Sequence, residues 1–403
     1  MRVHFLGIGG SGASAAAAIA QEQGFEITGC DLEPNNEFTT KLKPTQLLKG
    51  HSASHIVSGN VDILAVTPAI FSLDPQNPEL LEAKKIGIPI LTWQQFLGED
   101  LSKDKFVIAV CGTHGKTTTT AMVAQMLEDA GLDPTVELGA IHPKWKTNYK
   151  IGHGKYFVVE ADEFNDNFLH LKPDICVVTN IEMDHPEYFK DFEAVKKSFA
   201  KFKNQSKKVI DKPNPNLINF ALQVPGDFNI LNASLAFQVG LLLGIKPQTI
   251  QQSLSSYTGV GRRFEYLGDF HGAQVFSDFG HHPTEIKVTM EAAREKFPHQ
   301  RIILIYEPHM FSRTKFLFDD FVKVFKDLPV DRVGILDIYP SRELDTGLVT
   351  SKQLVEAINK ENITYFTWED LKMGLEYDTT SGDVVFFMGA GDIDKWAKEL
   401  VGK

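Results

Sequence analysis

The sequence predicts an α/β fold built around parallel sheets, and three observations lead to this prediction. Short apolar runs typical of strands alternate along the chain with segments of helical period. Two glycine-rich loops each follow such a strand and precede a helix. The chain has 403 residues, enough for two or three domains that each bury a core.

The composition argues against several classes of protein. Hydrophobic residues make up 43% of the chain and charged residues 23%, as in soluble globular proteins. No apolar run reaches the length of a membrane span, and a strand that begins at Arg2 leaves no room for a signal peptide. Three scattered cysteines without a CxxC pair indicate a reducing, cytoplasmic location. Because the net charge is −11, we expect no nucleic-acid partner, and no membrane partner either.

The first unit begins with a strand over residues 2–6, a glycine turn and an alanine-rich helix over 14–23. A second strand over 26–30 ends at Asp31, and further strands are expected at 62–67 and 88–91. The glycine turn reads Gly7-Ile8-Gly9-Gly10-Ser11-Gly12, a G-x-G-x-x-G pattern. Such a turn lets a diphosphate approach the helix N-terminus while a carboxylate such as Asp31 binds a ribose. The alternative is a turn that serves only close packing of helix and strand.

The second glycine loop follows an apolar strand over 106–110 and leads into a helix that includes 121–127. It reads Gly112-Thr113-His114-Gly115-Lys116-Thr117-Thr118, with Val110 where the first glycine of the common G-x-x-x-x-G-K-[ST] pattern would stand. Lysine at this position reaches the β- and γ-phosphates of a nucleotide, and the hydroxyl that follows it binds Mg²⁺. The loop therefore predicts use of a nucleoside triphosphate, and the alternative is a turn that only caps a helix.

Acidic residues follow two further strands of this second unit, predicted at 156–160 and 175–179. Because ligands gather at the carboxyl ends of parallel strands, these residues are candidates to bind Mg²⁺ beside a phosphate. The alternative assigns them to helix caps and surface charge. The candidates are Glu160, Asp162, Glu163, Glu182, Asp184 and His185.

The remaining elements complete the α/β pattern. A polar link over 98–105 marks a first domain boundary, and the stretch 204–228 is predicted to be irregular because prolines and a glycine interrupt it. Helices are expected near 191–202 and over 232–243. A third unit begins after Gly259, with strands expected at 274–277, 301–306, 332–336 and 384–388.

Taken together, these and later motifs resemble the Mur ligases over nearly the whole chain. The segments that carry the resemblance are Gly112–Thr118, Glu160–Glu163, Asn180–His185, Gly261–Glu265, Asp278–Glu285 and Gly389–Ile393. The resemblance implies three α/β domains. They are a Rossmann-like UDP-sugar-binding domain over 1–103, a shortened P-loop ATPase domain over 104–257, and a Rossmann-like amino-acid-binding domain over 258–403.

The resemblance also implies an activity, and it is strongest toward family members that join L-alanine to the carboxylate of UDP-N-acetylmuramate. In that reaction ATP, with Mg²⁺, converts the carboxylate to an acyl phosphate, which the amine attacks. The product enters peptidoglycan precursor synthesis. The expected partners are thus UDP-N-acetylmuramate and an amino acid, with L-alanine preferred, and the protein is expected to be a monomer or a weak homodimer.

Residue roles follow from the resemblance alone. Lys116, Glu160, His185 and Arg263 are the expected catalytic residues, and Thr117, Glu160 and His185 the expected Mg²⁺ ligands. The nucleotide is expected to contact Gly112, Thr113, His114, Gly115, Lys116, Thr117, Thr118, Asn229, Asn232, Arg263 and Asp278. The UDP-sugar and the amino acid are expected to contact Gly9, Gly10, Ser11, Gly12, Asp31, His51, Thr67, His282, His309 and Arg313.

Several positions depart from the family pattern. Phe228, Ser277 and Phe279 replace a histidine, an aspartate and a tyrosine, and Met310 stands where an arginine is expected near the amino-acid carboxylate. Arg313 is then the expected anchor of that carboxylate. Glu307 resembles a recycling ligase that attaches a whole murein peptide to the same sugar nucleotide, which is the first alternative. A nucleotide-binding relative without turnover is the second, suggested by Met310 and the short central domain.

His51 and His55 stand four residues apart, the spacing of a metal-binding pair on a helix. No third ligand follows them in the sequence. The resemblance instead places the segment near the uridine, and a plain surface role is the other alternative.

Overall fold

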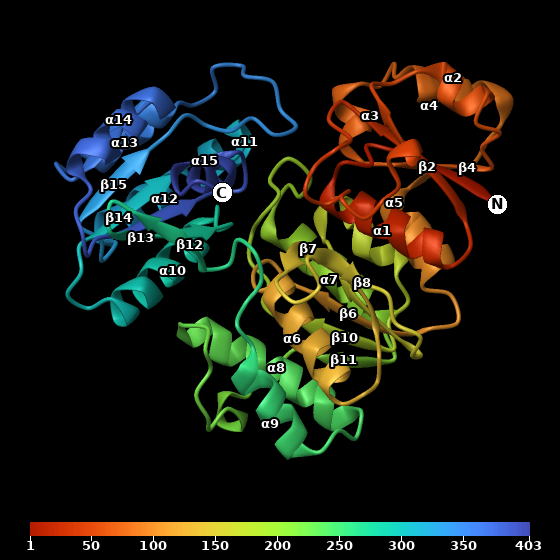
Figure 1. The fold of residues 1–403 in the computed structure, drawn as a ribbon, viewed down its shortest axis with the longest axis horizontal. Coiled ribbons are helices and arrows are strands. Elements are labelled where there is room, and N and C mark those ends of the chain that lie inside the picture. Colours follow the sequence, from red (N-terminus) through yellow and green to blue (C-terminus); the bar gives the residue numbers. More distant parts are fainter. The chain divides into compact units, whose positions relative to one another are not determined.

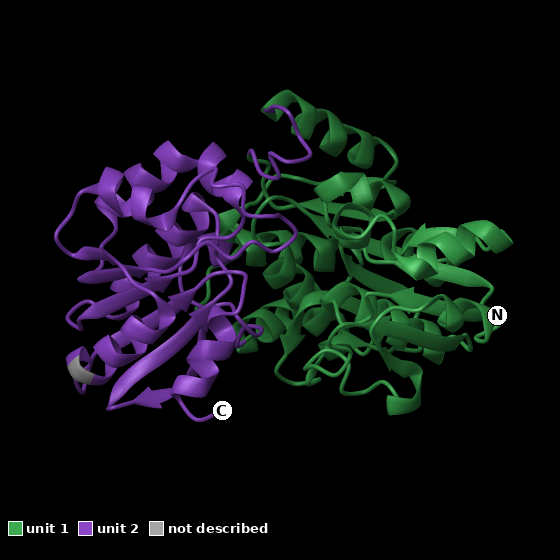
Figure 2. Cartoon of the chain, turned by 90° about the horizontal axis from the view of Figure 1, so that it is seen from above, with its two compact units in different colours: residues 1–182, 192–221, 231–257 green, residues 183–191, 222–230, 258–403 purple. Residues whose placement is uncertain are grey.

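The computed structural model describes residues 1–376 and 378–403. Its contacts divide the chain into two compact units, coloured in Figure 2. Unit 1 comprises residues 1–182, 192–221 and 231–257, and unit 2 comprises residues 183–191, 222–230 and 258–403. Three separate sheets form the framework, two of them in unit 1 and one in unit 2 (Figure 1). The α/β prediction with three domains is therefore confirmed.

The first sheet is fully parallel, with the strand order β3-β2-β1-β4-β5. Helices α1 and α5 pack together beside it, while α2 and α4 supply Ile56, Leu80 and Ala83 to a hydrophobic core of the same domain. The predicted strands and the alanine-rich helix are present, and β3 is an addition. The elements are β1 (Arg2–Leu6), α1 (Ser11–Glu22), β2 (Glu26–Asp31), β3 (Leu47–Lys49), α2 (Ala53–Val57), β4 (Ile63–Val66), α3 (Ala69–Leu73), α4 (Pro78–Ile86), β5 (Ile90–Thr92) and α5 (Trp93–Phe96).

Small residues on α1 explain how closely this helix lies to its neighbours. Its residues from Ala13 to Ala20 are buried. A Cβ atom added at Gly12 would lie 2.2 Å from Cζ2 of Trp93, so only glycine leaves room for the indole ring. The predicted polar link at 98–105 is partly helical, because Leu97–Leu101 form a helical turn and Leu101 is buried.

The second sheet has the order β11-β10-β6-β9-β7-β8, and only the β7–β8 pair is antiparallel. The stretch predicted to be irregular contains the short strand β11 and one 3-10 turn, Pro215–Leu217. The elements are β6 (Phe106–Cys111), α6 (Lys116–Asp129), β7 (Thr135–His142), β8 (Thr147–Lys150), β9 (Tyr156–Glu160), β10 (Ile175–Val178), α7 (Phe192–Asn204), β11 (Lys208–Ile210), α8 (Asp227–Leu242) and α9 (Pro247–Ser256).

The third sheet has the order β12-β13-β17-β14-β15-β16 and is parallel except for β12. Helices α10, α12 and α13 cover one face, and α14 and α15 cover the other. The elements are β12 (Glu265–Phe270), β13 (Ala273–Asp278), α10 (Pro283–Lys296), β14 (Ile302–Tyr306), α11 (Phe311–Phe316), α12 (Phe318–Asp327), β15 (Arg332–Ile335), α13 (Ser351–Ile358), β16 (Ile363–Tyr365), α14 (Trp368–Asp378), β17 (Val384–Met388) and α15 (Ile393–Leu400).

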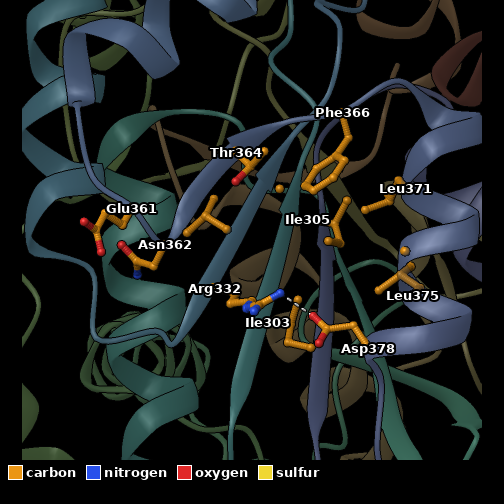
Figure 3. A pocket seen from close by; sticks show the side chains of 13 residues that line it. Ile303, Ile305, Arg332, Glu361, Asn362, Thr364, Phe366, Leu371, Leu375 and Asp378 are labelled. Carbon is orange, nitrogen blue, oxygen red and sulfur yellow. Dashed lines mark hydrogen bonds and ion pairs between the residues drawn. The ribbon is translucent and has the colours of Figure 1, made fainter.

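A pocket of about 610 Å³ lies between α14 and strands β14–β16 (Figure 3). Ile303, Ile305 and Phe366 make its floor apolar, and an ion pair between Arg332 and Asp378 borders it. None of the predicted site residues lines it. Among the described residues, no helix combines the length and the apolar character needed to cross a bilayer.

Candidate active site

The loop between β6 and α6 has the backbone shape of a phosphate-binding loop. Gly112 and Gly115 adopt φ angles of +136° and +79°, which side chains with a Cβ rarely adopt. A Cβ at Gly115 would also lie 2.6 Å from Oδ1 of Asn232. Lys116 begins α6, so the N-terminus of this 14-residue helix faces the loop.

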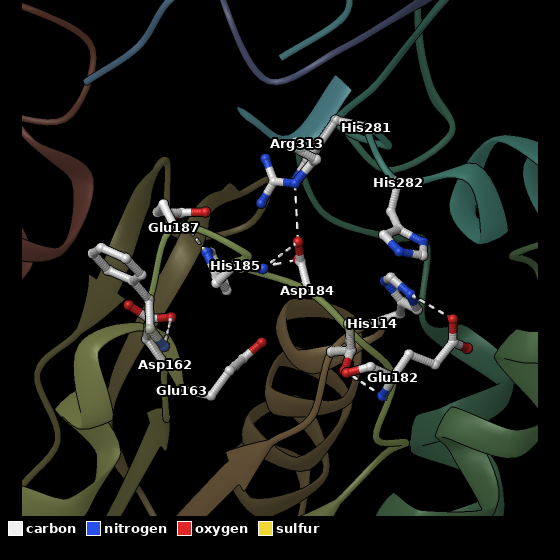
Figure 4. Close-up of polar contacts among 12 residues, drawn as sticks. His114, Asp162, Glu163, Glu182, Asp184, His185, Glu187, His281, His282 and Arg313 are labelled. Atoms are coloured by element: carbon white, nitrogen blue, oxygen red, sulfur yellow. Dashed lines mark hydrogen bonds and ion pairs between the residues drawn. The ribbon is translucent and has the colours of Figure 1, made fainter. Parts of the chain in front are cut away.

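Residues that follow β10 fix this loop through hydrogen bonds. The amide of His114 donates to Oδ1 of Asn180 at 2.9 Å, and Nδ2 of Asn180 donates back to the His114 carbonyl at 3.0 Å. The amide of Glu182 donates to Oγ1 of Thr113 at 2.8 Å. His114 and Glu182 also form an ion pair (Figure 4). The loop is thus held by the neighbouring strand before any ligand binds.

The ammonium of Lys116 is half-buried and paired. Its Nζ atom donates to the Gly112 carbonyl at 2.6 Å and lies 3.0 and 2.9 Å from the two carboxylate oxygens of Glu163. Burial favours the neutral amine, but the carboxylates of Glu163 and Asp162 outweigh burial and raise the pKa of Lys116. A permanent positive charge therefore lies at the mouth of the loop.

The hydroxyl of Thr117 and the carboxylate of Glu160 form a candidate site for a divalent cation. The Thr117 hydroxyl donates to Oε1 of Glu160 at 2.9 Å, and the amide of Gly139 donates to Oε2 at 2.8 Å. Hydroxyl and carboxylate oxygens are the ligands that Mg²⁺ prefers. Glu137 on β7 is buried nearby, and burial followed by the charge of Glu160 raises its pKa well above the usual value. These residues fit a hard cation bound next to a phosphate.

The glycine turn of the first domain forms a second candidate site. Gly7 has φ +87°, and its amide donates to the Cys30 carbonyl at 2.9 Å. The Gly9 amide donates to Oδ2 of Asp31 at 3.0 Å, and the Thr67 hydroxyl donates to the Gly7 carbonyl at 3.0 Å. Strand ends β1, β2 and β4 therefore meet at this turn, as in sites that bind a diphosphate.

In unit 2, Arg313 is paired with the loop that contains residues 183–191. Its Nε donates to Oδ1 of Asp184 at 2.9 Å (Figure 4). Its Nη1 lies 2.9 Å from Nδ1 of His309. Burial alone would raise the pKa of Asp184, but the charges of His185 and Arg313 hold it well below the usual value. Burial and the Arg313 charge lower the pKa of His281 to about 3. Asp184 and Arg313 therefore form an ionised pair, and the imidazole of His281 beside them is neutral.

Two neighbouring arginines, Arg262 and Arg263, lie against the ring of Phe279, which follows β13. The guanidinium groups of Arg262 and Arg263 lie 4.8 and 5.0 Å from the centre of the Phe279 ring. Asp278 is buried, and its two carboxylate oxygens accept the amides of Phe264 and Gly280 at 2.9 and 2.8 Å. Burial raises the pKa of Asp278, and the charge of Arg263 opposes that shift.

Three family models match the chain in succession. They describe the Mur ligase family catalytic domain (residues 2–105), the Mur ligase middle domain (110–213) and the Mur ligase glutamate ligase domain (262–391). A UDP-N-acetylmuramate–L-alanine ligase of Acetivibrio thermocellus is 38% identical over 98% of this chain and 94% of its own length. The chain belongs to the Mur ligase family.

Two solved structures share this Mur ligase architecture. The UDP-N-acetylmuramate-alanine ligase of Thermotoga maritima is 26% identical, has a TM-score of 0.81, and is matched over 100% of this chain and 98% of its own. A murein peptide ligase of Psychrobacter arcticus is 22% identical, with a TM-score of 0.69 and coverage of 100% and 99%. At 22% identity, the match with the murein peptide ligase shows that the two proteins share a fold.

The structure places the predicted residues of this Mur ligase in two groups. Unit 1 brings Lys116, Thr117 and Glu160 together at the phosphate loop and sets Asn232 against Gly115. Asn229 belongs to unit 2, where its Nδ2 donates to the Pro225 carbonyl at 2.7 Å. His185 also belongs to unit 2, where its Nδ1 lies 3.2 Å from Oε1 of Glu187.

Other predicted residues have structural partners of their own in this Mur ligase. Nδ1 of His282 accepts the amide of Thr284 at 3.2 Å and so caps α10. His51 lies with its Nδ1 3.3 Å from Sγ of Cys30. Met310 is fully buried, with φ +71° and its sulfur 4.0 Å from Nη1 of Arg313. Its side chain therefore occupies the space beside the guanidinium.

Two features of the phosphate site were not predicted from the sequence, the pairing of Glu163 and the presence of Glu137. Glu163 was recognised within a motif, but its pairing with Lys116 depends on how the chain turns after β9. Glu137 lies on β7, a strand that the apolar pattern did not predict, so the sequence carries no signal for it.

Proposed function

We propose that this Mur ligase joins L-alanine to the carboxylate of UDP-N-acetylmuramate with hydrolysis of ATP to ADP and phosphate. The observation that carries the proposal is the Lys116, Thr117 and Glu160 group at a preformed phosphate loop. The 38% identity with an alanine ligase over 98% of the chain supports the choice of substrates.

A carboxylate is a poor electrophile, so the reaction needs the muramoyl carboxylate to be phosphorylated first. The amine of alanine then attacks the acyl phosphate, and phosphate leaves with the bonding electrons. In this proposal Lys116 neutralises the phosphoryl group in transit, the role that electrostatic groups have in phosphoryl transfer. Thr117 and Glu160 hold Mg²⁺, which supplies charge neutralisation when bound, and His185 is proposed to contribute to a second Mg²⁺.

The other predicted residues receive roles consistent with their surroundings. Asn229 and Asn232 on α8 are proposed to contact adenine, and Arg263 and Asp278 the nucleotide phosphate and ribose. The Gly9–Gly12 turn with Asp31, His51 and Thr67 is proposed to bind the UDP-sugar. His282, His309 and Arg313 are proposed to orient alanine, with Arg313 as the cation that recognises its carboxylate. The proposed domains span 1–103, 104–257 and 258–403, and the proposed location is the cytoplasm.

Phosphate release with defined substrates tests this function. Purified protein is incubated with ATP, Mg²⁺ and UDP-N-acetylmuramate, and L-alanine, other amino acids or the murein tripeptide are added singly. Release that depends on L-alanine, with the UDP-muramoyl-alanine product identified by mass spectrometry, is the expected result. Preference for the tripeptide would instead identify a recycling ligase, the alternative that Glu307 suggests. No release with any acceptor, combined with tight ATP binding, would identify a relative without turnover.

A further inference from the structure

Five side chains with metal-binding atoms gather in the first domain, away from the phosphate loop. This His/Cys/Glu cluster consists of His4 on β1, Cys30 on β2, His51 and His55 at α2, and Glu79 on α4. The sequence shows only the His51 and His55 pair. The tertiary structure adds the other three residues.

The ligand atoms of the cluster are close together. Oε2 of Glu79 lies 3.0 Å from Nε2 of His4, and Oε1 lies 3.0 Å from both Sγ of Cys30 and Nδ1 of His55. One ligand atom from each of these four residues lies within 4.8 Å of the others. In a tetrahedral zinc site with bonds of 2.0–2.3 Å, ligand atoms are about 3.3–3.7 Å apart. To accommodate the ion, the contacts of 3.0 Å to Glu79 would open by a few tenths of an ångström, and the wider pairs, which lie within 4.8 Å, would close toward these values.

Hydrogen bonds do not account for the position of one imidazole nitrogen in the cluster, Nε2 of His4. Nε2 of His4 is fully buried and makes no hydrogen bond of acceptable geometry, although it lies 3.0 Å from Glu79. The side chain of His4 has no exposed surface, and burying a polar nitrogen without a well-aligned partner is costly. A cation at the centre would give the imidazole nitrogen a partner.

Surrounding groups already orient the ligands as second-shell residues do in zinc proteins. The other ring nitrogen of His4, Nδ1, lies 2.9 Å from Oγ1 of Thr28. The amide of Ser52 donates to Oε1 of Glu79 at 3.0 Å. Nδ1 of His51 lies 3.3 Å from Sγ of Cys30, where an N–H group would donate to a thiolate.

We propose that His4, Cys30, His55 and Glu79 bind one Zn²⁺ ion. The mixture of thiolate, imidazole and carboxylate favours zinc over Mg²⁺ or Ca²⁺, which prefer oxygen ligands alone. One thiolate, one carboxylate and two neutral imidazoles carry a charge of −2, so the buried complex would be neutral. Binding would release the thiol proton of Cys30 to solvent.

The site would tie the ends of β1 and β2 to α2 and α4. The Cys30 carbonyl accepts the amides of Gly7 and Ile8 at 2.9 and 3.1 Å, so the proposed ligand adjoins the glycine turn. Zinc would thereby fix the turn proposed to hold the UDP-sugar. The metal proposal itself does not depend on the identity of that ligand.

Cobalt substitution of the full-length protein tests the site. Metal is removed with a chelator, and Co²⁺ is added without nucleotide, because a thiolate ligand gives a charge-transfer band in the near ultraviolet. We expect one equivalent of Co²⁺ to produce this band and one equivalent of Zn²⁺ to abolish it. The melting temperature should rise with Zn²⁺, because binding stabilises the folded state.

Two variants and a control identify the ligands. Cys30→Ser should lose the charge-transfer band, and His55→Gln, at a half-buried position, should weaken Zn²⁺ binding at least tenfold. The control is Cys176→Ser, because Cys176 lies outside the cluster, with its sulfur 3.8 Å from that of Cys111. A wild-type protein without the band overturns the proposal, as does a band that survives in Cys30→Ser or disappears in Cys176→Ser. If Cys30→Ser fails to fold, unchanged binding by His55→Gln overturns it.

Discussion

Arg313 and Asp184 form a buried ion pair, with the guanidinium Nε 2.9 Å from Oδ1 of the carboxylate. Arg313 is 1% exposed, although 129 residues separate the partners in sequence. The residue proposed to recognise the carboxylate of alanine is thus already bound to a carboxylate of the protein. The carboxylate of alanine therefore has to bind the guanidinium together with Asp184, or displace Asp184 from it.

A substitution that keeps the positive charge of Arg313 but removes its guanidinium group can separate its pairing with Asp184 from its proposed recognition of alanine. Arg313→Lys retains a cation for Asp184 but loses the two parallel donors of a guanidinium. We expect the KM for alanine to rise roughly 10- to 1000-fold, equivalent to about 1.5–4 kcal/mol, with a small change in melting temperature. Steady-state kinetics with varied alanine give the result. An unchanged KM would mean that Arg313 only positions the 183–191 loop.

Lys116→Met is expected to abolish turnover, because it removes the cation that faces the phosphoryl group. It also removes the cation that pairs with the buried carboxylate of Glu163, at a cost of about 3–5 kcal/mol in stability. The double variant Lys116→Met/Glu163→Gln should recover most of that stability but no activity. Lys144→Ala, at an exposed pair with Glu128, is the matched control. Turnover above about a tenth of wild type would contradict the role of Lys116.

The glycine turn can be tested at Gly10 with little disturbance of the protein. A Cβ at Gly10 would lie 3.5 Å from its nearest neighbour, whereas a Cβ at Gly9 would lie 2.9 Å from Asp31. Gly10→Ala should therefore fold normally but weaken UDP-N-acetylmuramate binding at least tenfold, because the methyl group obstructs a diphosphate. Calorimetric titration measures the affinity, with Gly374→Ala as control since no atom lies within 4 Å of its Cβ. Equal affinities of Gly10→Ala and wild type would exclude this binding site.

Glu307 should make stability depend on pH. Burial raises its pKa to about 7, so between the unfolded value near 4.5 and pH 7 the folded state binds more protons than the unfolded state. Stability should therefore fall as pH rises through this window, by about 3 kcal/mol in total. Glu307→Gln should melt higher than wild type at pH 8, with little difference at pH 4.5. The exposed Glu399→Gln is the control, and equal shifts at both pH values would argue against the raised pKa.

Local patterns in the sequence were sufficient to predict most central strands and the phosphate loop. Strands at 156–160 and 384–388 were predicted from apolar runs, since a strand buried on both faces carries a continuous signal. Short edge strands such as β3, β8 and β16 gave no such run. Strand β11 was also not predicted, because it lies within the stretch 204–228, whose prolines and glycine predicted an irregular segment.

By itself the sequence determined the family, the fold class and the residues proposed to bind phosphate, because the glycines, the lysine and the hydroxyl group of that motif stand within one short segment. Only the tertiary structure decided which groups become partners across long sequence separations. It paired Lys116 with Glu163 and Arg313 with Asp184, and it assembled His4, Cys30, His55 and Glu79. Such contacts depend on strand order and helix packing, which local periodicity does not encode.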